Sequence, residues 1–186
     1  MAFSQARDPS WVRLATLVTL ATVAVVVARF GLNPQTPAFC YLAAVGVPLA
    51  FIDVREYRLP DALTLPSYPA CLLLLGVAAP FLPGGTGRFV HALIGMAAAA
   101  ALFFLLLLAF PAGIGMGDVK LAGPLGAYLG WLGATAFVAG LMAAWLLAAV
   151  TGLGLMAAGR ATRKTQLPFG PFLIIGAFLA ILASTF

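Results

Sequence analysis

Long apolar segments, separated by short polar connections, follow one another along the whole chain. They cover approximately residues 11–28, 38–52, 62–82, 89–110, 119–158 and 169–184. A helix of about 20 apolar residues crosses the hydrocarbon core of a bilayer, so most of these segments have the length of a membrane span. Of the 186 residues, 63% are hydrophobic and only 8% are charged, which excludes a soluble domain. The sequence therefore predicts an all-α fold, a polytopic helical bundle embedded in a membrane.

The apolar segment 119–158 is too long for a single crossing. As one helix it would extend roughly 60 Å, about twice the thickness of the hydrocarbon core. Gly130 and Gly133 flank Trp131, and tryptophan is enriched at membrane interfaces, so these residues predict a turn. The break leaves a short first piece at 119–130 and a second piece at 133–158. It brings the expected number of membrane segments to about seven.

The basic residues test this break independently. With the break, eight Lys and Arg residues lie on one side and two, Arg29 and Arg88, on the other; without it the split is five to five. The larger group comprises Arg7, Arg13, Arg55, Arg58, Lys120, Arg160, Arg163 and Lys164. Because cationic loops stay on the cytoplasmic side, we expect a cytoplasmic N-terminus and an outside C-terminus. The same rule accounts for the net charge of +5 without a nucleic-acid partner, and the expected surroundings are the lipid bilayer.

Two of the five acidic residues, Asp53 and Asp118, each lie at the end of an apolar segment. An ionisable side chain at a membrane boundary is costly, which makes it a candidate functional residue. Both aspartates fall on the predicted cytoplasmic side, although the topology was built from other residues. Taken singly, either aspartate could instead cap a helix. Their pairing favours a shared site.

Two carboxyl groups that share one proton can activate a water molecule and polarise a peptide carbonyl. The residues before Asp118 suit such a site. Gly113, Gly115 and Gly117 permit positive φ angles and close backbone approach. With Pro111 they predict a non-helical approach to Asp118 and a helix that begins after it. Exposed backbone of this kind could pair with an extended substrate, so the residues favour an aspartyl peptidase.

Three motifs resemble those of the type IV prepilin peptidases, a family of intramembrane aspartyl proteases. Gly115-Met-Gly-Asp118 fits the GxGD signature, and its extension through Lys120 resembles this family in particular. Asp53-Val-Arg-Glu-Tyr-Arg-Leu-Pro-Asp61 resembles the segment that carries the first catalytic aspartate. Leu167-Pro-Phe-Gly-Pro-Phe172 resembles the C-terminal motif before the last helix. A lone GxGD is weak evidence, whereas the three motifs together, in the family's order, are specific.

The resemblance implies one membrane-embedded peptidase domain over residues 1–186, with a catalytic bundle at 38–186 and an extra helix and loop at 1–37. It implies removal of a short basic leader peptide from type IV pilin-like precursors, at the cytoplasmic face of the bacterial inner membrane. Asp53 and Asp118 would be the catalytic pair. The residues expected to bind substrate or support the pair are Gly113, Gly115, Gly117, Lys120, Arg55, Arg58, Asp61, Pro168, Gly170 and Pro171.

The sequence departs from the bifunctional members of that family, which also methylate the new N-terminus and carry a cytosolic insert with paired CxxC motifs. It has no such insert, and its two cysteines, Cys40 and Cys71, lie in apolar segments as expected for buried small residues. It therefore resembles the short tight-adherence (Flp) pilus type, for which no N-methylation is expected. With one histidine and no cysteine cluster, the sequence predicts neither a metal nor another cofactor.

Several of the supporting residues have a second interpretation. Arg55 and Arg58 could recognise an acidic residue of the mature pilin, or they could anchor the positive side of the protein. Asp61 could meet the basic leader together with Glu56, or it could cap the next helix. Lys120 could tune the pKa of Asp118, bind substrate carbonyls or extend to the membrane interface.

A proton-coupled transporter is the rival function, because paired membrane carboxylates also form proton relays. Transport would favour inverted repeats and charges at the membrane midplane. The chain shows no internal repeat, and both aspartates are expected at one face. A structural subunit of a secretion machine is a third alternative, and it would not need the aspartates.

Overall fold

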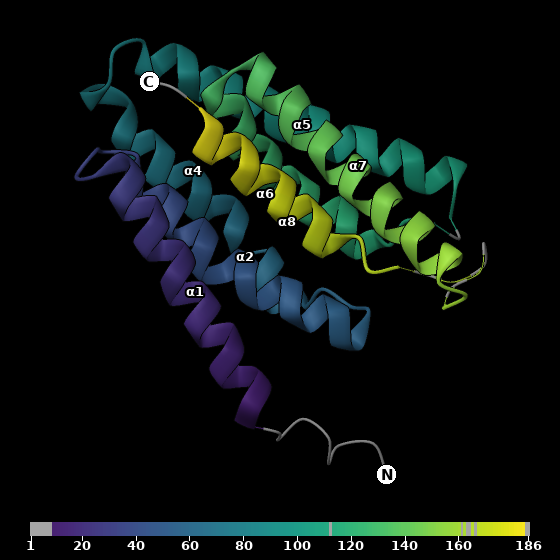
Figure 1. Cartoon of the computed structure of the whole chain (residues 1–186). Coiled ribbons are helices and arrows are strands. Elements are labelled where there is room, and N and C mark those ends of the chain that lie inside the picture. Colours follow the sequence, from purple (N-terminus) through teal and green to yellow (C-terminus); the bar gives the residue numbers. More distant parts are fainter. Residues whose placement is uncertain (1–8, 112, 161, 163–164, 166, 185–186) are drawn as a thin grey trace.

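The computed structural model describes residues 9–111, 113–160, 162, 165 and 167–184, and the regular structure within them is entirely helical. This confirms the predicted all-α fold (Figure 1). The elements are α1 (Pro9–Phe30), α2 (Thr36–Glu56), α3 (Asp61–Thr64), α4 (Ser67–Ala78), the 3₁₀ turn η2 (Ala79–Phe81), α5 (Gly85–Ala109), α6 (Met116–Leu132), α7 (Ala134–Ala157) and α8 (Gly170–Ala183).

Among the residues that the structure describes, five helical stretches are long and apolar enough to cross a membrane. They are Ser10–Phe30, Thr36–Glu56, Asp61–Phe81, Gly85–Ala109 and Ala134–Ala157. The remaining two, α6 with 17 residues and α8 with 14, are shorter. The chain thus runs along the bundle about seven times, in agreement with the predicted number of segments.

Helix α6 is the central helix of the bundle, and neighbouring helices cover most of its residues. Thirteen of its 17 residues are buried, against three of the 24 residues in α7. At 1.5 Å per residue α6 is about 25 Å long, slightly less than the hydrocarbon thickness. Because neighbouring helices cover it, α6 contacts protein along most of its length.

A break inside residues 119–158 is present, but it lies at Gly133 alone. Gly130 and Trp131, which were predicted to form the turn, belong to α6, and Trp131 is buried. Helix α6 ends at Leu132, and α7 begins at Ala134. The single residue between them, Gly133, has a φ of +110°, a backbone conformation that residues other than glycine rarely adopt. The glycine thus permits the chain to reverse within one residue.

Three long-range contacts show which helix ends lie together. At one end, the Arg55 guanidinium of α2 lies 5.2 Å from the ring centroid of Trp11 in α1. At the same end of α2, Asp53 Oδ2 accepts a hydrogen bond from the backbone N–H of Gly170, where α8 begins. At the opposite end, Arg29 of α1 donates to the backbone carbonyl of Ser184, just after α8. We call the end that holds Asp53 and Gly170 the carboxylate end.

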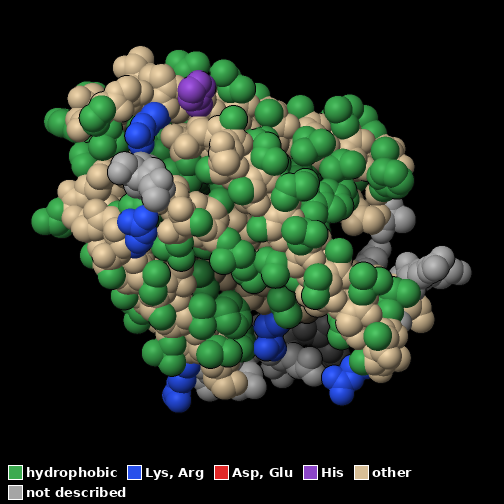
Figure 2. All heavy atoms as spheres, turned by 45° about the horizontal axis from the view of Figure 1, so that its top comes forward, with side chains coloured by type: hydrophobic (Ala, Val, Ile, Leu, Met, Phe, Trp, Pro, Cys, Tyr) green, Lys and Arg blue, Asp and Glu red, His purple; other side chains and the backbone are tan. Residues whose placement is uncertain are grey.

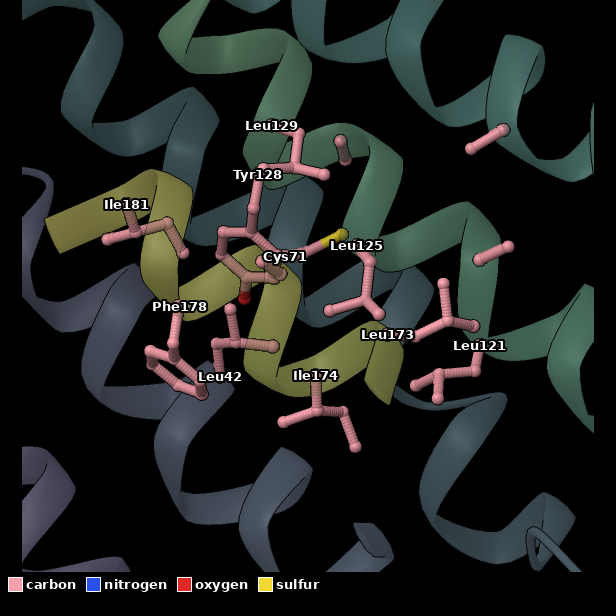
Figure 3. Packing of buried hydrophobic residues seen from close by; sticks show 14 of the residues in the cluster. Leu42, Cys71, Leu121, Leu125, Tyr128, Leu129, Leu173, Ile174, Phe178 and Ile181 are labelled. Carbon is pink, nitrogen blue, oxygen red and sulfur yellow. The ribbon is translucent and has the colours of Figure 1, made fainter. Parts of the chain in front are cut away.

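The core lies where α2, α4, α6 and α8 meet (Figure 3). Its buried side chains include Leu42, Cys71, Leu125, Tyr128, Leu173, Ile174 and Ile181. The outward faces of the other helices are hydrophobic as well, and Leu20, Leu105, Leu146 and Val150 are each at least 60% exposed. The face drawn in Figure 2 is covered mainly by hydrophobic side chains and backbone, with Lys and Arg toward its margins. A surface of this kind is suited to lipid rather than to water.

Candidate active site

Asp53 lies in the last turn of α2 and is only 5% exposed. Its Oδ2 atom accepts a 3.0 Å hydrogen bond from the backbone N–H of Gly170, the first residue of α8. The start of a helix has unpaired N–H groups and a positive end of the helix dipole, so it stabilises a carboxylate. A Cβ atom at Gly170 would lie 2.8 Å from the same oxygen, so a side chain there would force the carboxylate to shift. Pro171, the second residue of α8, is compatible with a helix start, where no N–H partner is needed.

Asp118 is the third residue of α6 and is only 8% exposed. Its Oδ2 atom accepts a 3.1 Å hydrogen bond from the backbone N–H of Gly115, the residue that caps the helix. The two aspartates are therefore held alike: each is buried, and each is bound through Oδ2 by a glycine N–H beside the start of a helix.

Three details of the sequence prediction are corrected here. Helix α6 begins at Met116, two residues before Asp118 rather than after it, because the Asp118 carboxylate itself completes the N-terminal cap. Helix α2 continues to Glu56, so Asp53 is helical and does not begin a polar loop. The two glycines of the motif that lie just before Asp118 do not adopt positive φ angles. Gly115 is extended, with φ −88° and ψ 155°, and Gly117 is helical.

The small size of Gly117 is what its position requires. A Cβ atom there would lie 3.1 Å from Cβ of Leu59, closer than side chains normally pack. Gly113 lies one turn earlier in the chain, and its N–H donates to the carbonyl of Phe110 at 2.9 Å. The glycine run thus combines a cap for α6 with room for a neighbouring side chain.

Two cavities meet at the aspartates. The larger, about 600 Å³, is lined mainly by polar and charged residues, namely Asp53, Glu56, Tyr57, Arg58, Leu59, Pro60, Asp61, Gly115, Met116, Gly117, Asp118 and Lys120. The smaller, about 160 Å³, is lined by Asp53, Tyr57, Pro111, Gly113, Ile114, Gly115, Asp118, Leu167, Pro168 and Phe169. Asp53 and Asp118 line both cavities, so the pair lies where a compartment with four further charged residues meets one that has no other charged residue in its lining.

Contacts in and near the larger compartment bear on the alternative roles of the supporting residues. Lys120 Nζ lies 2.7 and 2.9 Å from the two carboxylate oxygens of Asp61, and this is the ion pair found in the described part of the chain. Asp61 makes no helix-capping bond, so its interpretation as a cap is wrong. Arg58 lines the compartment, whereas Arg55 packs on Trp11 of α1 and lines neither cavity.

Sequence reasoning missed three residues of the site. Leu59 is buried between the starts of α6 and α8. Tyr57 lines both cavities and has a left-handed conformation, with φ 51° and ψ 34°. Phe169 lines the smaller cavity and stacks near Trp145 and Phe103, with ring centroids 5.1 and 5.9 Å away. Leu59 and Tyr57 lie inside a recognised motif, but nothing in their spacing shows which of its residues turn inward.

No group of three or more His, Cys, Asp and Glu side chains within the described ranges could hold a metal ion.

Comparison with known proteins gives one consistent result. Residues 39–185 match the model of the type IV leader peptidase family. Over 182 residues the chain is 35% identical to a prepilin leader peptidase/N-methyltransferase of Aeromonas hydrophila, a match that covers 95% of this chain and 58% of that protein. The corresponding protein of Burkholderia pseudomallei (strain K96243) is 36% identical over 169 residues, with coverage of 88% and 52%.

The protein of that name in Aeromonas salmonicida is 37% identical over 157 residues, covering 79% of this chain and 51% of the relative. The chain thus spans between half and three fifths of the length of these curated relatives. No solved structure matches it. The family match extends over both aspartates, the glycine run and the start of α8, and the chain therefore belongs to the type IV leader peptidase family.

Proposed function

We propose that this chain is an aspartyl endopeptidase that removes the short basic leader peptide from type IV pilin-like precursors. The observation that carries the proposal is the pair Asp53 and Asp118, buried at the junction of two cavities and held in the same way. Family membership and the names of the relatives support this choice of substrate.

In the proposed mechanism, one aspartate is ionised and the other is protonated. The carboxylate removes a proton from a water molecule as the water attacks the scissile carbonyl carbon, while the carboxylic acid donates its proton to the carbonyl oxygen. The tetrahedral intermediate then collapses, the C–N bond breaks, and a proton passes to the leaving nitrogen. Because the glycine N–H groups bind Oδ2 of each aspartate, the Oδ1 atoms are the ones assigned to the water and the peptide.

The two compartments suit a substrate that is basic before the scissile bond and carries a large side chain after it. Glu56, together with the aspartate pair, brings negative charge to the larger compartment, where we assign the basic leader. The smaller compartment, lined by Ile114, Leu167 and Phe169, would receive the side chain that follows the cut. A cavity of about 150 Å³ holds one benzene ring, so about 160 Å³ accommodates a single large side chain.

We assign the carboxylate end to the cytoplasmic face of the bacterial inner membrane. Within the described residues, five cations lie in or just beyond the helix turns on that side, namely Arg13, Arg55, Arg58, Lys120 and Arg160, while Arg29 and Arg88 belong to the opposite end. This imbalance is the one expected of cytoplasmic loops. It gives a cytoplasmic N-terminus and a C-terminus outside. Both aspartates then lie at one face rather than at the midplane, which favours a peptidase over a proton-coupled transporter.

We also propose that this chain does not methylate its product. The relatives are named for both activities, but this sequence has two cysteines in all, Cys40 in α2 and Cys71 in α4, and neither belongs to a CxxC pair. The mature pilin should therefore keep a free, unmethylated amino group after reaction with the purified protein and a methyl donor. Mass spectrometry of the new N-terminus checks this, and a gain of one methyl group would contradict it.

Co-expression with a tight-adherence pilin precursor tests the activity itself. Cells with the wild-type chain should convert the precursor to a faster-migrating product, and N-terminal sequencing should locate a single cut after the basic leader. A precursor that stays full-length beside well-inserted wild-type protein would contradict the proposed function. Parallel cultures without the chain control for host peptidases.

A further inference from the structure

The segment between α2 and α3 forms a short loop, residues 57–60, over the aspartates. It begins with Tyr57, whose left-handed conformation is uncommon for a non-glycine residue. The N–H of Tyr57 bonds the carbonyl of Asp53 at 2.9 Å and closes the last turn of α2, which ends at Glu56, three residues after the first aspartate. Such conformations persist where surrounding contacts fix them, and here two anchors follow at once.

Leu59 is the first anchor. It is 9% exposed, and its side chain lies against two glycines on different helices. A Cβ atom at Gly117 would lie 3.3 Å from Leu59 Cδ1, and one at Gly170 would lie 3.5 Å from the same atom. Gly117 immediately precedes Asp118, and Gly170 binds Asp53. Leu59 is thus the spacer between the two helix starts that hold the aspartates.

The ion pair of Asp61 and Lys120 is the second anchor. It joins the first residue of α3 to α6, two residues beyond Asp118. Both oxygens of Asp61 lie within 2.9 Å of Lys120 Nζ, so the two residues are engaged with each other in this structure. Asp61 is 57% and Lys120 32% exposed, and both line the larger compartment.

These contacts pair the two motifs residue by residue: Asp53 faces the same cavities as Asp118, Leu59 packs on Gly117, and Asp61 binds Lys120. We infer that Leu59, Asp61 and Lys120 are positioning residues. Their contacts hold the loop, residues 57–60, against the starts of α6 and α8 and thereby set the separation of the two aspartates. This inference rests on the proposed function, since the pair must be aligned for both carboxyl groups to act on one peptide bond.

The alternative is that Lys120 acts on the substrate or on Asp118 directly. The two roles differ in their coupling to Asp61. If Lys120 and Asp61 work only through each other, removing the second partner costs nothing once the first is gone. If Lys120 acts directly, its loss reduces activity whether or not Asp61 is present.

A double-mutant cycle separates these roles. We expect Asp61→Asn and Lys120→Met each to lower kcat about three- to fivefold, the range for a partly exposed pair, with KM nearly unchanged. The double variant should lose no more than the single variants. Arg13→Met, which removes an exposed cation of α1 at the same end but outside both cavities, serves as the control and should keep wild-type kcat. Losses that multiply in the double variant, or single variants with wild-type kcat, would overturn the inference.

Leu59 provides the second measurement. Leu59→Ala should lower kcat by about 10- to 100-fold through misalignment, whereas Leu59→Met, which conserves volume, should recover most of the activity. Equal kcat for Leu59→Ala and wild type would contradict the spacer role. If Leu59→Ala does not fold, the double-mutant cycle of the exposed Asp61–Lys120 ion pair still tests the inference. Wild-type protein that fails to cleave the precursor refutes the proposed function and the inference together, whereas active wild type with an additive cycle refutes the inference alone.

Discussion

Replacing either Asp53 or Asp118 by Asn should lower kcat on the order of 10⁴-fold while leaving the protein inserted and folded. Asparagine keeps the shape of the side chain and can still accept the hydrogen bond from Gly170 or Gly115 through its carbonyl oxygen. It cannot exchange a proton with water or with the scissile carbonyl. Because two groups that share one proton act as a unit, the loss of either is nearly as severe as the loss of both.

The rate should be measured with purified variants and a precursor peptide, and folding should be compared by thermal unfolding in detergent. Glu56→Gln provides a contrast, since it removes a carboxylate from the same cavity but outside the pair. We expect it to raise KM for a basic leader more than it lowers kcat. An Asn variant within tenfold of wild-type kcat would show that its aspartate is not part of the pair.

The second large effect concerns the contact of α5 with α6. A Cβ atom at Gly126 would overlap the backbone carbonyl of Gly95, and a Cβ atom at Gly95 would overlap that of Gly126. Small residues allow helix backbones to approach this closely, and a backbone atom cannot move aside as a side-chain tip can. We expect Gly126→Val to destabilise the protein by more than about 3 kcal/mol, at the upper end of the range for overpacked cores.

Thermal unfolding in detergent measures this destabilisation. Trp131 lies on α6 and is buried, so the change in tryptophan fluorescence as it becomes exposed on unfolding follows the transition. Gly154→Ala is the matched control: Gly154 is inside α7, with open space where a Cβ atom would stand. Alanine there should change stability by less than about 1 kcal/mol, in the stabilising direction. A Gly126→Val protein with the unfolding temperature of wild type would mean that α5 and α6 do not pack as described.

The sequence predicts the features that depend on neighbours along the chain. The apolar segments, the turn at Gly133 and the boundary positions of Asp53 and Asp118 all follow from local composition and length. Counting cations predicts the side of the membrane for each loop, and this orientation stays a prediction. These properties need no knowledge of which helix packs on which.

The rest of the site depends on contacts between distant residues. Gly170 binds Asp53 across 117 positions, and Lys120 binds Asp61 across 59. The role of Leu59 depends on two glycines of other helices, so no periodicity of its own segment could indicate it. Gly117 illustrates the difference. Its place in a glycine run suggested freedom of the backbone φ angle, whereas the structure shows that a side chain there would crowd Leu59.

The most direct test of the central claim compares cleavage by four purified proteins in the same lipid vesicles: wild type, Asp53→Asn, Asp118→Asn and the double variant. Mass spectrometry of the products gives the site and the rate of cleavage. The account predicts one cut after the leader by wild type, and residual rates that are equally low in the two single variants and the double variant. Cleavage at the same bond by either single variant at a rate near that of wild type would contradict it.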